Sequence, residues 1–147
     1  MNARERFEQT RRAIIRLDEV HALIMYGCDD WQPPSVRTKS DKSDPTANKA
    51  IRNVDELEEK LASLRKEETE LTDFIGTTLA IIKAVHDGFG EIYALLLEAR
   101  YIDGKTWADI YELHAIKRTK GHYLIDVACD WVDSVGVSRL LRGETEI

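Results

Sequence analysis

The sequence predicts an all-α protein, in which an N-terminal helix and a long coiled-coil-like helix precede a C-terminal helix-turn-helix bundle. Apolar residues recur at steps of three and four along most of the chain, which is the period of an amphipathic helix. All three prolines (Pro33, Pro34 and Pro45) fall in one short window, outside every segment expected to be helical. With 43% hydrophobic and 33% charged residues, the chain has the composition of a folded, helix-rich protein.

The first predicted element is a helix within residues 1–27, followed by a flexible linker over residues 28–48. Gly27 is suited to cap the helix end, and the linker is rich in Ser, Asp, Lys and Pro. The linker is expected to be a solvated connection, although its basic residues leave open a role as an arm that contacts phosphate. The helix's apolar stripe is Phe7, Ile14, Leu17, His21 and Ile24, with His21 expected in the core, and the basic residues in and directly after the linker are Arg37, Lys39, Lys42 and Lys49.

A long dimerisation helix is predicted over residues 49–87, because a heptad pattern runs through this segment. It could pair with the first helix as a hairpin or with a second copy of itself. At 1.5 Å per residue the first helix is about 36 Å long and the second about 60 Å, so we expect a homodimer that uses at least part of the seam. The apolar seam positions are Ala50, Val54, Leu57, Leu61, Leu64, Leu71, Ile75, Ile82 and Val85, and Glu68 and Thr78 interrupt them.

Residues 88–136 are predicted to form the helix-turn-helix domain, after a break at the glycines of HDGFG. A short helix from about Gly90 to Tyr101 and a last helix from about Arg118 to Val135 are expected, and residues 137–147 are expected to be a frayed tail. The apolar face of the short helix is Ile92, Leu95, Leu96 and Ala99, and that of the last helix is Leu124, Ala128, Trp131 and Val135.

Composition excludes several function classes. The net charge of −6 argues against a generic polyanion binder. Cys28 and Cys129 are too few for a disulfide framework and lack metal-site spacing, and the histidines form no metal constellation. No phosphate-cradling glycine motif or nucleophile elbow occurs, so we expect no enzyme, no catalytic residue and no cofactor. Neither a signal peptide nor an apolar run of membrane length is present, which predicts a cytoplasmic protein without membrane association.

Positive charge gathers in one stretch of this acidic chain. Residues 100–122 carry five basic and three acidic side chains, whereas residues 55–73 carry three basic and eight acidic ones; residues 1–16 and 36–52 are also locally basic. Thr106 and Asp109 match a capping box, which predicts a helix start. A short helix, a tight connection and a second helix that begins with KRTK form the layout of a helix-turn-helix.

The segment YIDGKTWADI followed by a basic helix resembles the C-terminal part of phage late transcription regulators of the ArpU and RinA type, whose helix-turn-helix is similar to region 4 of bacterial sigma factors. The loop and the long charged helix before it also look like the N-terminal half of that group, so the resemblance covers residues 36–132. It implies a phage- or prophage-encoded transcriptional regulator that binds double-stranded DNA.

Four positions depart from a standard helix-turn-helix. Tyr111 stands where a small residue is usual, His114 at an apolar core site, Ala115 at the turn glycine and Gly121 where a valine is usually buried. We therefore expect the two helices to pack unusually. Ile110, Ile116 and Leu124 do match the apolar core positions.

The predicted DNA-binding residues are those that would be exposed on or beside the recognition helix. Arg118 is the candidate for a bidentate guanine contact, and lysines would meet backbone phosphates. The set is Lys105, Lys117, Arg118, Thr119, Lys120, His122 and Tyr123.

Two other interpretations remain. The altered motif could bind a protein, such as RNA polymerase or a host defence factor. The chain could also be a small terminase subunit, which joins a helix-turn-helix to an oligomerising helix.

Overall fold

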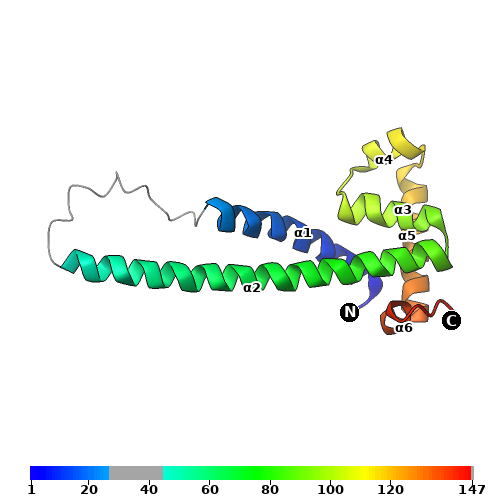
Figure 1. The fold of residues 1–147 in the computed structure, drawn as a ribbon. Helices are drawn as coiled ribbons and strands as arrows, with labels where there is room; N and C mark the ends of the chain where they lie inside the picture. Colours follow the sequence, from blue (N-terminus) through cyan, green and yellow to red (C-terminus); the bar gives the residue numbers. More distant parts are fainter. Residues whose placement is uncertain (27–44, 147) are drawn as a thin grey trace. The chain divides into compact units, whose positions relative to one another are not determined.

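The computed structural model describes residues 1–26 and 45–146, with side chains described from residue 54 in the second range. The described chain is all-helical, as predicted (Figure 1). In order, the elements are α1 (Ala3–Tyr26), α2 (Pro45–Gly88), α3 (Glu91–Leu97), the π-helix η2 (Glu98–Ile102), α4 (Trp107–His114), α5 (Arg118–Val135) and α6 (Val137–Leu141). They divide into two compact units: Met1–Ile15 with Thr72–Ile147, and Arg16–Leu71.

The first unit contains the main core, to which every helix of the unit contributes. Phe7 of α1, Ile81 of α2 and Leu96 of α3 are each 0% exposed. The predicted stripe of α5 is confirmed, since all four of its residues are buried. Burial of these apolar side chains is the main favourable contribution to folding of this unit. The buried apolar residues that form this core cluster are Ala3, Phe7, Ile81, Ile82, Val85, Ala94, Leu96, Leu97, Ala99, Ile110, Ile116, Leu124, Ile125, Ala128, Cys129, Trp131, Val132, Val135 and Leu140.

A pair of buried hydroxyl groups explains why Thr78 interrupts the heptad seam. In the first unit the Oγ1 atoms of Thr10 and Thr78 are 2.8 Å apart, and both residues are 0% exposed. Arg6 donates from Nε to the Thr78 Oγ1 over 3.3 Å and stacks on the Phe74 ring. A buried polar group is costly unless it is hydrogen-bonded, so the two threonines are complementary to each other rather than to an apolar partner.

Glu68, the other interruption of the seam, also has a partner on α1, here in the second unit. Its Oε2 lies 3.0 Å from Nε2 of His21. His21 was predicted in the core; it is instead exposed, because the polar ring reaches Glu68 from the edge of the interface. Part of the seam is thus occupied by α1 of the same chain, as the hairpin alternative required.

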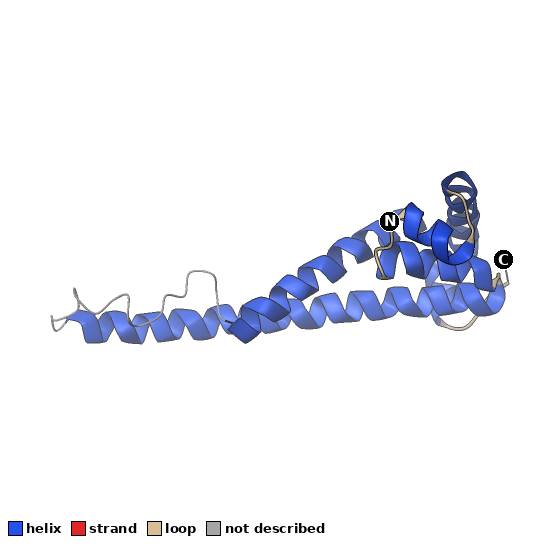
Figure 2. Cartoon of the chain, turned by 90° about the horizontal axis from the view of Figure 1, so that it is seen from above, coloured by secondary structure: helices blue, strands red, loops and turns tan. Residues whose placement is uncertain are grey.

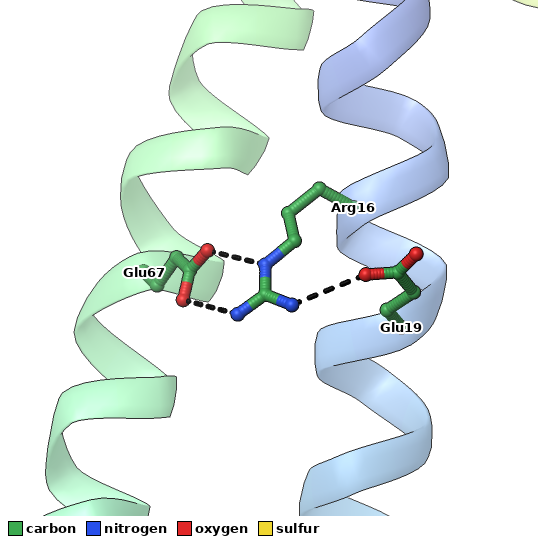
Figure 3. Close-up of polar contacts among 3 residues, drawn as sticks. All are labelled: Arg16, Glu19 and Glu67. Atoms are coloured by element: carbon green, nitrogen blue, oxygen red, sulfur yellow. Dashed lines mark hydrogen bonds and ion pairs between the residues drawn. The ribbon is translucent and has the colours of Figure 1, made fainter.

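Arg16 of α1 forms a bidentate ion pair with Glu67, the residue directly before Glu68 in α2 (Figure 3). Arg16 donates from Nε and Nη2 to the two carboxylate oxygens of Glu67, over 2.6 and 3.1 Å, and from Nη1 to Glu19. The bidentate contact holds the pKa of Glu67 below its ordinary value. Beyond this region the seam is open: Val54 and Leu57 are 53% and 45% exposed.

The helix bounds differ from the prediction in three places. Helix α2 begins at Pro45, inside the expected linker, because proline suits the first turn of a helix. The short helix ends in a π-helical turn, closed by the Asp103 amide donating to the Glu98 carbonyl over 2.9 Å. Residues Val137–Leu141 are not a frayed tail but form α6, since Leu140 is 3% exposed and packs into the core. The predicted linker up to position 44, with Arg37, Lys39 and Lys42, lies outside the described residues, whereas Lys49 falls within α2.

Every described element is drawn as helix or as a short connection in Figure 2. Leu96 of α3 and Ala99 of η2 are buried as predicted, whereas Ile92 of α3 is 40% exposed, which corrects its place in the predicted apolar face. The connection from η2 to α4 matters most, because it sets where the helix-turn-helix begins.

Candidate nucleic-acid interface

Helix α4 begins at the predicted capping box. The Asp109 amide donates to Thr106 Oγ1 over 3.2 Å, and the Thr106 amide donates to the Asp109 carboxylate over 3.3 Å. Two amides that the helix leaves unpaired are thereby satisfied. Just before it, Gly104 adopts a φ of 68°, which only a glycine or a few polar residues accept without strain. The Asp-Gly turn thus places the start of α4.

A three-residue connection at 115–117 separates α4 from α5. Ala115 has a φ of 56° and a ψ of 29°, the left-handed conformation that normally selects glycine at a helix C-terminus. Its amide donates to the Tyr111 carbonyl over 2.8 Å. The alanine therefore occupies the turn position with the expected backbone, at a cost of about 1 kcal/mol from its Cβ.

Gly121 is buried because the Trp107 ring lies against it. A Cβ built on Gly121 would stand 2.7 Å from Cη2 of Trp107 and closer still to Cζ3. A standard helix-turn-helix usually buries a valine at position 121. Here the Trp107 side chain of α4 fills that space instead. This is the unusual packing that the departures from the motif predicted.

The other two departures cause no conflict in the core. Tyr111 is 54% exposed, and His114 is exposed as well. Ile110 and Ile116, at 0% and 6% exposed, provide the apolar contacts of the α4 side of the motif. Trp107 of α4 contacts α5 at Gly121 and His122.

Six of the seven predicted DNA-binding residues lie together on the exposed first two turns of α5 or at its N-cap. Lys117 occupies the N-cap position of the helix, without a capping hydrogen bond from its side chain, and Arg118 begins the helix. Tyr123 is 65% exposed. Lys105 is half-buried in the connection before α4, so it lies apart from this set along the chain. The exposed set is Lys117, Arg118, Thr119, Lys120, His122 and Tyr123.

Within this set Arg118 and His122 contact each other. Arg118 Nε donates to Nε2 of His122 over 3.4 Å, which leaves both terminal nitrogens of the guanidinium unused by that bond. The His122 ring also packs on Trp107, with centroids 4.7 Å apart. Partial desolvation, and then the nearby charges of Arg118, Arg100 and Arg4, lower the pKa of His122.

Sequence reasoning missed four arginines that lie beside this interface. Arg4, Arg11 and Arg12 of α1 and Arg100 of η2 line a cavity of about 400 Å³ that Trp107 and His122 also border. The locally basic composition of residues 1–16 was the available signal. The sequence alone could not show that α1 brings this charge to the helix-turn-helix.

Comparison of the chain with protein-family models, with curated proteins and with solved structures found no match. None of the helices in the described ranges is long and apolar enough to cross a membrane. Among residues 1–26 and 45–146, no group of three or more His, Cys, Asp or Glu side chains is placed to hold a metal ion.

Proposed function

We propose that this chain is a phage- or prophage-encoded transcriptional regulator that acts in the host cytoplasm and binds duplex DNA as a homodimer. The observation that carries the proposal is the exposed, basic start of α5, presented behind a capped α4 and a three-residue turn. In a helix-turn-helix the second helix enters the major groove with its N-terminal residues against base edges. The sequence resemblance to ArpU- and RinA-type regulators supports the same role.

Each exposed residue of α5 has a chemically defined part in this proposal. Arg118 would reach a guanine with its two terminal nitrogens, while its Nε stays on His122. Lys117 and Lys120 would contact phosphates and contribute the salt dependence of binding. Thr119 and Tyr123 carry hydroxyl groups that can bond phosphate or a base edge.

The homodimer is supported by the open part of the α2 seam. Val54 and Leu57 occupy heptad positions and remain 53% and 45% exposed. Apolar heptad positions that α1 leaves exposed are suited to pair with the same positions of a second copy. A dimer would also present two recognition helices to two half-sites.

Gel retardation tests DNA binding directly. The purified protein is titrated onto duplex DNA from upstream of its own gene and of the late genes, at several salt concentrations. Arg118→Ala and Lys120→Ala are expected to weaken retention, and Lys120→Ala to lower the salt slope by about one phosphate contact. Lys66→Ala is the matched control, because Lys66 is an exposed lysine of α2 outside the motif.

The proposal fails if no duplex is retained at low salt, or if Arg118→Ala and Lys120→Ala bind as the control does. The dimer is tested separately by light scattering. A monomer of 16.8 kDa at micromolar concentration would exclude it. Ring-sized oligomers would instead support the terminase subunit.

A protein partner is the second candidate, and a specific observation favours it. Tyr111, Leu113 and Tyr123 are 54%, 58% and 65% exposed on α4 and α5. Large apolar and aromatic side chains are enriched at protein interfaces. Capture of RNA polymerase that is lost with Tyr111→Ser and kept with Lys120→Ala, in the absence of DNA retention, would establish this alternative.

A further inference from the structure

A cavity whose charged wall residues are mostly positive lies between α1, η2, α4 and α5. Its walls include four arginines and a single carboxylate, Glu8, together with three aromatic or imidazole rings. Its volume of about 400 Å³ lies within the range of small-molecule sites. The wall residues used below are Arg4, Arg11, Arg12, Arg100, Trp107 and His122.

Backbone carbonyls hold two of these guanidinium groups in place. Arg11 donates from Nη1 to the Ile102 carbonyl over 2.9 Å, and Arg100 donates from Nη1 to the Lys105 carbonyl over 2.9 Å. Arg100 also lies 5.0 Å above the Trp107 ring. A carbonyl orients a guanidinium without neutralising it, and most of its five N–H donors stay available.

The turn before α4 is shaped to admit Arg11. A Cβ at Gly104 would stand 2.5 Å from the Cζ of Arg11, and the φ of 68° at Gly104 independently favours glycine. The Arg11 guanidinium therefore lies directly against the backbone of the Asp-Gly turn. The fold therefore fixes the position of the Arg11 guanidinium, which is not a freely moving surface group.

The positive charge of the cavity is left largely uncompensated. Arg4 pairs with Asp126, but within residues 1–26 and 45–146 no ion pair joins Arg11, Arg12 or Arg100 to a carboxylate. Three guanidinium groups facing one cavity match a dianion better than a single charge. A phosphate monoester carries close to two negative charges at neutral pH, whereas each phosphodiester of a DNA backbone carries one.

We propose that this cavity binds a small phosphorylated ligand, whose dianionic phosphate group is held by Arg11, Arg12 and Arg100. The cavity is large enough for a ligand of mononucleotide size, with the phosphate at the arginines and the remainder toward Trp107 and His122. Charge-assisted, bidentate contacts from arginine are the usual means of phosphate recognition in proteins. The proposal does not depend on DNA binding by α5.

Calorimetric titration with AMP and with inorganic phosphate, at constant ionic strength, tests the site. Arg12→Gln is the informative variant, because Arg12 is exposed and bonds no other described residue, so its loss leaves the core intact. We expect Arg12→Gln to weaken binding about tenfold or more. Arg65→Gln, which removes an exposed arginine of α2 far along the chain from the cavity, is expected to bind as the unaltered protein does.

The Trp107 indole N–H cross-peak in an ¹H–¹⁵N spectrum locates the binding, and it should shift with AMP. Absence of binding up to about 10 mM would overturn the proposal. Equal weakening by Arg65→Gln, or an unmoved Trp107 peak, would also overturn it, since binding would then be nonspecific. If only duplex DNA binds and Arg12→Gln weakens its retention, the cavity is part of the DNA surface and the small-ligand site is excluded.

Discussion

Substitution of Gly121 tests the packing on which the whole interface depends. Gly121→Ala places a methyl group 2.7 Å from Cη2 of Trp107, well inside the 3.5–4.0 Å at which carbon atoms pack. The indole cannot turn away freely, because Arg100 lies over it and His122 packs against it. Either the ring leaves its site or α4 moves away from α5.

Two opposing effects set the magnitude. Alanine is more favourable than glycine inside a helix by about 1 kcal/mol. Overpacking of a rigid ring costs about 1–3 kcal/mol, and so short a contact puts Gly121→Ala near the upper end. We expect the free energy of unfolding to fall by about 2 kcal/mol.

Urea unfolding followed by far-UV circular dichroism gives this free energy for five proteins: the unaltered chain, Gly121→Ala, Gly76→Ala, Trp107→Leu and the double variant Trp107→Leu/Gly121→Ala. Gly76→Ala is the matched control, because a Cβ at Gly76, also inside a helix, would meet no atom within 4 Å. It should stabilise the protein by about 1 kcal/mol. In a Trp107→Leu background, which removes Cη2 and Cζ3, Gly121→Ala should change sign and stabilise by a similar amount. Stabilisation by Gly121→Ala in the unaltered protein would refute the Trp107 contact.

Three further measurements probe other sites. Ala115→Gly should raise the free energy of unfolding by about 1 kcal/mol, because φ is 56° there; an unchanged or lower value would mean that the turn differs. Thr10→Val and Thr78→Val should each lower the free energy of unfolding by about 1 kcal/mol, because each removes the bond between the two hydroxyl groups while the remaining hydroxyl keeps its own backbone carbonyl acceptor; the double variant should cost less than the sum, and additive losses would argue against the pair. Burial raises the pKa of Cys129 to about 11, so in a Cys28→Ser variant the thiol should resist alkylation at pH 8 until the protein unfolds; rapid labelling of the native protein would contradict its burial.

The helices themselves could be predicted because each depends on its own sequence. The stripe of α5 and the Thr106–Asp109 capping box are local patterns, and both are present. The prediction of a frayed tail over residues 137–147 was wrong, because it too was based on the local sequence alone. Nothing within residues 137–147 indicates that Leu140 meets a core formed by distant segments.

The apparent faults in the helix-turn-helix were also visible in the sequence, but their meaning was not. In the sequence Gly121 appears to remove core volume, but the structure places the Trp107 ring in the same space. Glu68 and Thr78 appear to break the heptad seam, but they pair with His21 and Thr10 of α1. Each is one half of a complementary pair. The sequence at one position shows one residue of the pair but not the distant residue that packs against it.

The amino-acid order by itself therefore determined the helix class, the capped start of α4 and the basic start of α5, because period, capping and local charge act within a few residues. Tertiary structure alone decided that Arg11 and Arg12 of α1 share a cavity with Arg100 of η2. These residues lie nearly ninety positions apart. Their approach follows from burial of Phe7 and its neighbours in a common core, which is a property of the whole packed unit and of no single segment.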